Sequence, residues 1–251
     1  MSIQVFKKDV QANGNFNNGE ILEKKPIGFP QDGGESRPYS NLFYWAHAWA
    51  PTKESVIGLH PHRGFEICSF VLKGEIEHYD TLLDKWITLK KGDVQVIRAG
   101  KGISHSEKLK KGSEIFQIWF DPDITKTLHV EPSYNDFKSE LFSKEIINGI
   151  QLKTISNKEN QIGLKSYGIN IFEYSFTDGY HSHKIEQNSY HSFFILSGSL
   201  IIKNQEIDKG DFVIINNEID LQLLTSNCKL FEIISPLITP YKTYAEIHKI
   251  N

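Results

Sequence analysis

Two short segments of the sequence carry side chains that bind transition metals. His60 and His62 lie two residues apart in the first segment, and His105 and Glu107 lie two residues apart in the second. In an extended strand, side chains two residues apart point to the same face. Two such strands lying side by side would direct three imidazoles and one carboxylate to one point. The sequence therefore predicts a metal site with these four ligands.

The donor atoms restrict the choice of metal. Three neutral imidazoles and one carboxylate suit borderline divalent cations, namely Fe(II), Mn(II), Ni(II), Cu(II) and Zn(II). Around a six-coordinate ion these four ligands leave positions open for a substrate or dioxygen, whereas they would fill a four-coordinate zinc completely. The residues alone leave both arrangements open, and with them a catalytic and a purely structural role for the ion.

Residues next to the histidine pair have alternative interpretations. On a regular strand Glu66 shares a face with His62, so we expect its carboxylate to hold a ligand imidazole, with direct metal binding as the alternative. Arg63 could steer a phenolate into the site or lie exposed at its rim. His78 stands near a hairpin corner and is expected to be structural.

Short strands are predicted for most of the chain, and these must position the ligands. β-branched and aromatic residues gather in runs that are bounded by Gly, Asn and Asp turns. Helical periodicity is limited to residues 135–142 and 241–248. The clearest strand runs are residues 67–72, 94–97, 115–120, 169–176 and 212–215.

The order of these signals repeats once along the chain. A His-x-His pair, a glycine and a Gly-Asp corner occur at residues 60–62, 74 and 92–93, and again at 181–183, 198 and 210–211. A period of about 120 residues is the length of one double-sheet β-barrel. We therefore predict an all-β protein of two tandem barrels. The expected boundary follows Glu131-Pro132-Ser133-Tyr134, which gives domains at residues 1–135 and 136–251.

The second half of the chain lacks part of the ligand set. His181 and His183 repeat the first histidine pair, with Glu186 and His191 nearby. No His-x-Glu pair follows the second Gly-Asp corner, however. We therefore expect a C-terminal barrel without a complete metal site, and the role of His181 and His183 stays open.

Composition argues against several other classes of protein. The 251 residues carry a formal net charge of -3 at pH 7, so no basic excess favours direct binding of nucleic acid. Apolar runs are far shorter than the roughly 20 residues of a membrane-spanning helix, so no membrane association is expected. Lysines and an aspartate stand where a secretory signal would be apolar, so we expect a cytoplasmic location. Cys68 and Cys228 should be buried free thiols.

The motifs around the predicted ligands resemble those of the pirins, which are bicupin proteins. The resemblance is close over the first half of the chain and fades beyond Tyr134. It rests on His60-Pro-His-Arg-Gly-Phe-Glu66, Gly74-Glu75, Glu77-His78-Tyr79-Asp80, Gly92-Asp93-Val94-Gln95, Ala99-Gly-Lys-Gly-Ile-Ser-His-Ser-Glu107 and Phe116-Gln117-Ile118-Trp119.

Expectations for the fold and the cofactor come with this resemblance. It implies two tandem cupin domains of the double-stranded β-helix, or jelly-roll, type. It also makes His60, His62, His105 and Glu107 the ligands of a single metal, with Fe(II) as first choice and Zn, Mn, Ni or Cu as alternatives. The bacterial, quercetinase-like branch is the better match, because the C-terminal half is shorter than in the fuller pirins.

The resemblance also implies a function. Pirin-like proteins include quercetin 2,3-dioxygenases, which would cleave a flavonol or similar aromatic enol with O₂, and Glu107 would then take the phenolic proton. A small aromatic substrate and O₂ are the partners expected from this interpretation. The alternative is a non-catalytic, metal-dependent and redox-sensing regulatory protein, similar to the nuclear animal relatives, which would bind a protein partner.

Overall fold

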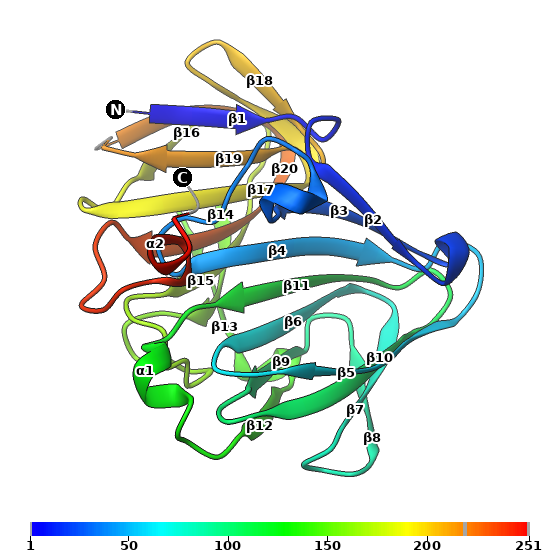
Figure 1. The fold of residues 1–251 in the computed structure, drawn as a ribbon. Helices are drawn as coiled ribbons and strands as arrows, with labels where there is room; N and C mark the ends of the chain where they lie inside the picture. Colours follow the sequence, from blue (N-terminus) through cyan, green and yellow to red (C-terminus); the bar gives the residue numbers. More distant parts are fainter. Residues whose placement is uncertain (1, 218–219, 250–251) are drawn as a thin grey trace. The chain divides into compact units, whose positions relative to one another are not determined.

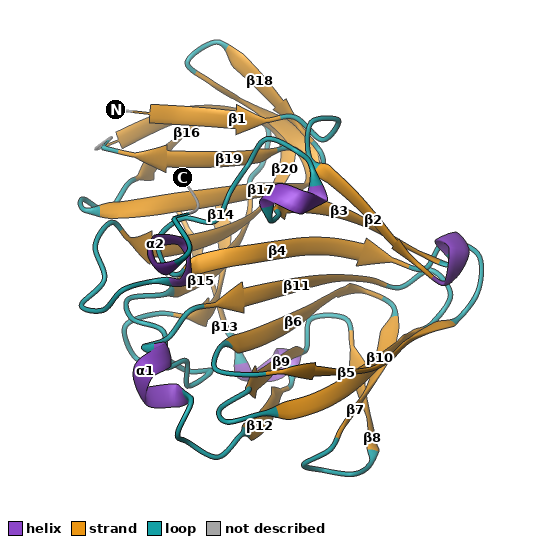
Figure 2. Ribbon diagram, viewed as in Figure 1, coloured by secondary structure: helices purple, strands orange, loops and turns teal. Residues whose placement is uncertain are grey.

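Strands make up most of the computed structural model, which describes residues 2–217 and 220–249 (Figure 1; Figure 2). In this part of the chain the α-helices α1 (Ile124–Thr127) and α2 (Tyr244–Ile247) have four residues each. Three further turns are 3₁₀-helical, at Asn17–Gly19, Pro30–Asp32 and Ser139–Leu141. The prediction of an all-β fold is therefore confirmed.

Two compact units divide the chain, and each is assembled from more than one stretch of sequence. We call them the N-terminal and the C-terminal unit after their longest stretches. As independently folding domains, residues 1–135 and 136–251 stay a prediction. The N-terminal unit consists of Gln11–Leu141, Leu164–Ser166 and Tyr241–Asn251, and the C-terminal unit of Met1–Val10, Phe142–Gly163 and Tyr167–Pro240.

The N-terminal unit contains two antiparallel sheets. One has seven strands in the order β12-β9-β6-β11-β4-β3-β2, and the other has four in the order β5-β10-β7-β8. The predicted metal ligands lie in the smaller sheet, on β5 and β10. The strands are β2 (Ala12–Phe16), β3 (Ile21–Ile27), β4 (Leu42–Trp49), β5 (Ser55–His62), β6 (Glu66–Lys73), β7 (Glu75–Asp80), β8 (Trp86–Lys90), β9 (Val94–Arg98), β10 (Ile103–Leu109), β11 (Glu114–Phe120) and β12 (Ser133–Phe137).

An apolar cluster anchors the smaller sheet. Ile76 on β7, Leu89 on β8 and Leu109 on β10 are fully buried in it. Burial of each such side chain stabilises the fold by about 1.5–3 kcal/mol. The cluster holds the C-terminal end of β10 through Leu109, and so helps to fix the positions of His105 and Glu107 on the same strand.

The C-terminal unit is a nine-stranded sheet. Its main path runs β1-β19-β17-β20-β15-β14-β13, while β16 pairs with β20 and β18 with β17. Its core is an apolar cluster that includes Phe193, Val213 and Leu230. The strands are β1 (Ser2–Phe6), β13 (Ser143–Ile147), β14 (Ile150–Ser156), β15 (Asn170–Ser175), β16 (Gly179–Lys184), β17 (Ser189–Ile202), β18 (Gln205–Asp208), β19 (Phe212–Asn216) and β20 (Asp220–Pro236).

The two Gly-Asp corners are built in the same way. Val71 exchanges two backbone hydrogen bonds with residues 92–93: its N–H donates to the Asp carbonyl, and its carbonyl accepts from the Gly N–H. Ile195 exchanges the same two bonds with residues 210–211. The repeat in the sequence therefore corresponds to repeated structure, and Val71 and Ile195 are matched positions in the two units.

Most local predictions are confirmed, with one error. The five predicted strand runs coincide with β6, β9, β11, β15 and β19, and Cys68 and Cys228 are buried free thiols. The helix predicted at 241–248 contains α2. The helix predicted at 135–142 is wrong, because residues 133–137 pair with β9 as strand β12. No helix among the described residues has the length and apolar character needed to cross a membrane.

Candidate metal centre

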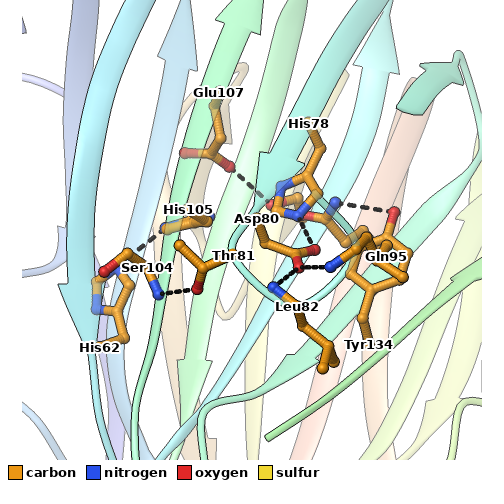
Figure 3. Close-up of polar contacts among 12 residues, drawn as sticks. His62, His78, Asp80, Thr81, Leu82, Gln95, Ser104, His105, Glu107 and Tyr134 are labelled. Carbon is orange, nitrogen blue, oxygen red and sulfur yellow. Dashed lines mark hydrogen bonds and ion pairs between the residues drawn. The ribbon is translucent and has the colours of Figure 1, made fainter. Parts of the chain in front are cut away.

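Three imidazoles converge where β5 pairs with β10. The antiparallel register places His60 directly opposite His105, and His62 one pleat further along β5. A nitrogen from each ring lies within 4.8 Å of a nitrogen of the other two, and His62 Nε2 is 3.0 Å from His105 Nε2 (Figure 3). Two donors bound at right angles to one ion, each about 2.1 Å from it, would lie about 3.0 Å apart. The spacing of these nitrogens therefore fits a shared metal ion.

The tautomer of His60 also fits. Its Nδ1 lies 2.8 Å from the carbonyl oxygen of Gly58, which can only accept a hydrogen bond. The ring proton must therefore be on Nδ1, and the lone pair on Nε2 is available to a metal.

The environment keeps the other two rings neutral. Burial, together with the neighbouring His105 and His60 rings, lowers the pKa of His62 to about 3. Burial and the neighbouring His60 and His78 rings likewise lower the pKa of His105 well below its usual value. Neutral imidazole is the form that binds metals, so both rings are ready to act as ligands near neutral pH.

Glu107, the fourth predicted ligand, is fully buried on β10, the strand of His105, but its carboxylate is hydrogen-bonded to other side chains. Among the described residues, the group of donors that meet within 4.8 Å comprises the three imidazoles without Glu107. The amide of Gln117 donates to its two carboxylate oxygens at 2.8 and 2.7 Å, and the hydroxyl of Ser69 donates at 3.2 Å. The structure thus brings three of the four predicted ligands together, and metal binding by Glu107 stays a prediction.

Gln117 connects Glu107 to the aromatic wall of the site. The indole N–H of Trp119 donates to the amide oxygen of Gln117 at 3.2 Å, which leaves the amide NH₂ to face Glu107. The Trp119 ring in turn packs against the edge of His62, with 5.1 Å between ring centroids. A single polar network therefore holds the carboxylate close to the imidazoles without using a charged partner.

Glu66 and Arg63 occupy different surroundings. Glu66 is almost fully buried, and its carboxylate accepts from the backbone N–H groups of Lys165 and Ser166, each at 2.8 Å, and from the Ser166 hydroxyl. It thereby ties residues 164–166 to the N-terminal unit, while no hydrogen bond from a ligand imidazole to Glu66 is found among the described residues. Arg63 is exposed.

A cavity of about 490 Å³ opens beside His62. Phe65 and Ile103 give it apolar walls, His62 belongs to its lining, and Arg63 contributes a cation. Thr81 and Ser104 add polar residues to its lining. A cavity of this size suits a small, planar and partly anionic molecule.

Sequence reasoning missed one pair of buried polar residues near the centre. His78 and Asp80 are both 0% exposed, and His78 lies 5.6 Å from His105 between ring centroids. The alternation on β7 could have revealed them, because residues 78 and 80 share a face and β7 pairs with β10.

The C-terminal unit has a different residue at the critical position. Strand β16 pairs with β20 as β5 pairs with β10, so that His181 lies opposite Leu223 where His60 lies opposite His105. Leu223 is fully buried. Thr225 takes the place of Glu107, because it lies two residues after Leu223 and pairs with Leu200 on β17 as Glu107 pairs with His78 on β7. These two positions thus differ from the N-terminal unit, and the absence of a complete metal site in the C-terminal unit stays a prediction.

A second group of metal-binding side chain types lies in the C-terminal unit and consists of His183, His191 and Glu232. His191 Nε2 accepts the backbone N–H of Glu186 at 2.8 Å, which places the ring proton on Nδ1, where it donates to Glu232 at 2.5 Å. A metal on Nδ1 would move that proton to Nε2, where it would face the N–H of Glu186. We therefore interpret the group as a hydrogen-bonded cluster within the core.

Comparison with known proteins finds relatives with similar sequences and solved structures with a similar fold. The family model Pirin matches residues 36–120, the segment that contains the three imidazoles. A pirin-like protein of Arabidopsis thaliana is 35% identical over 113 residues, which are 43% of this chain and 35% of the relative. An Escherichia coli protein named Quercetin 2,3-dioxygenase is 39% identical over 69 residues, 26% of this chain and 29% of the relative. The matches thus span about a third of these curated relatives.

Solved structures extend the likeness of the fold to nearly the whole chain. A bacterial pirin of Escherichia coli, crystallised in complex with nickel(II), superposes with a TM-score of 0.76 at 20% identity, covering 94% of this chain and 100% of that one. The expected fold class, two tandem cupin units, is accordingly confirmed. Residues 36–120 of the protein described here therefore match the pirin family, and nearly the whole chain has the fold of a bacterial pirin.

Proposed function

We propose that this protein is a metal-dependent dioxygenase of the quercetin 2,3-dioxygenase type, which cleaves a flavonol or a similar aromatic enol with O₂. The observation that carries the proposal is the convergence of His60, His62 and His105, of which His62 also lines the cavity. The name of the Escherichia coli relative supports the same reaction. The metal we expect is one divalent transition ion, with Fe(II) first and Zn, Mn, Ni and Cu as alternatives.

The residues of the site have separate tasks in this reaction. A bound metal supplies Lewis acidity and, when it is iron, redox chemistry with dioxygen. His60, His62 and His105 hold the ion. Phe65 packs against the planar rings of the substrate in the cavity.

Glu107 is the base in this proposal. Its carboxylate takes the proton of the substrate's 3-hydroxyl group, after exchanging its contacts with the Gln117 amide for one with that hydroxyl. Because Gln117 is a neutral donor, this exchange separates no ion pair. The net reaction adds both atoms of O₂ to the flavonol and releases its C3 carbon as carbon monoxide.

The test is anaerobic loading of the full chain with Fe²⁺, followed by air and quercetin, while flavonol absorbance and carbon monoxide are recorded. His105→Ala should abolish both metal retention and flavonol loss. His181→Ala is the matched control, because His181 takes the place of His60 in the other unit, opposite Leu223. Retention of one metal per chain without carbon monoxide would favour the regulatory alternative.

A further inference from the structure

A buried histidine-aspartate pair lies on β7, next to the strand that carries His105. His78 Nε2 is 2.9 Å from Asp80 Oδ2, and both residues are 0% exposed (Figure 3). The other oxygen of Asp80 accepts the backbone N–H groups of Leu82 and Leu83, each at 2.8 Å. Since a carboxylate only accepts hydrogen bonds, the proton of His78 belongs on Nε2 and its Nδ1 keeps a lone pair.

The lone pair on His78 Nδ1 has a fixed direction but accepts no hydrogen bond from a described residue. His78 Nδ1 is buried and without a hydrogen-bond partner among the described residues. The ring cannot turn freely, because it is stacked on Tyr134 with 5.0 Å between centroids and an interplanar angle of 15°. The site therefore presents one fixed, unused acceptor.

His105 presents the complementary donor. Its Nε2 faces His62 Nε2 at 3.0 Å, so this is the nitrogen that would bind a metal, and the ring proton must then be on Nδ1. His105 Nδ1 is also buried without a partner among the described residues. The two rings lie 5.6 Å apart between centroids, close enough for one bridging water or, after a small rotation, for direct contact.

The C-terminal unit provides an internal comparison for these positions. On β10, His105 is paired with Asp80 and Glu107 with His78. On β20, Leu223 is paired with Ile202 and Thr225 with Leu200. The unit that lacks the counterpart of His105 thus also lacks the polar pair, and it has buried leucine and isoleucine at both places.

We propose that Asp80 and His78 are positioning residues for the metal ligand His105. His78 Nδ1 accepts the Nδ1–H of His105, directly or through one water, and Asp80 fixes the tautomer of His78 that makes this possible. His105 is thereby kept with an unprotonated Nε2 that faces the metal. The inference rests on the proposed metal centre and is independent of the proposed reaction.

Three variants separate this role from a general effect on folding. Asp80→Asn keeps the shape, but its NH₂ group would force the proton of His78 onto Nδ1, where it would oppose the N–H of His105. His78→Leu introduces the residue that the C-terminal unit has at the matched position, Leu200. Both should weaken binding of Zn²⁺ by at least about 10-fold. His78→Asn places an amide oxygen near the position of Nδ1, so it should retain most of the affinity.

Zn²⁺ affinity is measured on the full chain by competition with a chromophoric chelator, and urea unfolding reports on stability. The second measurement needs no variant: imidazole ¹⁵N shifts in the metal-free parent should show Nε2–H on His78 and Nδ1–H on His105. Affinity unchanged in Asp80→Asn and His78→Leu, or an Nδ1–H on His78, would overturn the inference. A parent chain that binds no Zn²⁺ would overturn it together with the metal centre, whereas missing flavonol cleavage would affect only the reaction.

Discussion

Glu232 lies in the C-terminal unit at the position that Gln117 occupies in the N-terminal unit. Gln117 on β11 is paired with Ser69, and Glu232 on β20 is paired with Phe193. Ser69 and Phe193 each lie two residues before the residue that bonds to the Gly-Asp corner, which is Val71 in one unit and Ile195 in the other. The same strand position thus carries an amide in one unit and a carboxylate in the other, and only the carboxylate can change its charge with pH.

The carboxylate at this position should make stability sensitive to acid. Burial alone would raise the pKa of Glu232, but its contact with His183 and its hydrogen bond from His191 outweigh burial and lower the pKa from 4.5 to about 2. A carboxyl group whose pKa is lower in the folded than in the unfolded state stabilises the fold at pH values above the unfolded pKa. This stabilisation, here about 3 kcal/mol, is lost as the pH falls toward 2. Urea unfolding at pH 6 and pH 3 should show more than half of this loss in the parent, because pH 3 still lies above the folded pKa. Glu232→Gln should be less stable at pH 6 and should vary less between the two pH values; an equal pH dependence would contradict the assignment.

Removing the charge of Glu107 should reduce turnover far more than it disturbs the fold. Glu107→Gln removes the proposed base, so flavonol cleavage should fall by about 100-fold or more. Steady-state rates with quercetin measure the effect. Ser69→Ala is the control, because it deletes only a hydroxyl that contacts the carboxylate at 3.2 Å. Comparable rates in Glu107→Gln and the parent would exclude the proposed role.

Arg63 should affect substrate binding and leave the chemical step unchanged. It is exposed and lines the cavity, so its attraction for a flavonol anion is weakened by solvent. Arg63→Ala should raise KM by about two- to fivefold with kcat unchanged, and Arg63→Lys should raise it less. Added salt should raise the KM of the parent and have little effect on that of the alanine variant. A changed kcat with unchanged KM would be inconsistent with this role.

Gly198 and Gly149 offer a matched test of packing at a turn. Both have positive φ, +69° and +79°, so alanine at either position is strained by about 1–2 kcal/mol. At Gly198 the added Cβ would also meet the carbonyl oxygens of Ser226 and Asn227, while at Gly149 nothing lies within 4 Å. Gly198→Ala should therefore destabilise by more than about 3 kcal/mol in urea unfolding. Similar losses in the two variants would show that the contact relaxes easily.

One metal ion per chain is expected. The His183, His191 and Glu232 cluster uses both ring nitrogens of His191 in hydrogen bonds, so it should not compete for Zn²⁺. Titration of the full chain should saturate at one equivalent, and His62→Ala should remove that binding. Saturation at two equivalents, or one equivalent remaining in His62→Ala, would show that the second cluster binds metal.

The strands, and the face that each pair of predicted ligands shares, could be predicted because both follow from local spacing. The alternation that places His60 and His62 on one face also makes a strand amphipathic, so a single pattern predicts the element and the direction of its side chains. The same reasoning failed at residues 135–142, where pairing with β9 decides the conformation and local periodicity does not. Sequence spacing contains no information about such long-range pairing.

Contacts between side chains on different strands were beyond prediction for the same reason. The bonds from Gln117 to Glu107 depend on which strands are neighbours, as does the proximity of His78 to His105. Glu66 shows the limit most clearly, since its partners Lys165 and Ser166 lie about a hundred residues away in the sequence. A strand pattern assigns a side chain to a face, and only the assembled sheet determines what that side chain meets.

The buried leucines and isoleucine of the C-terminal unit make its specialisation difficult to reverse. A Leu223→His change alone would bury an imidazole opposite Ile202, without the polar pair that His78 and Asp80 form beside His105. Folding would suffer before any ion could compensate, so a new metal centre there would need coordinated replacements on β17 and β20. The acquisition of a second metal centre by single substitutions would therefore pass through variants that fold less well.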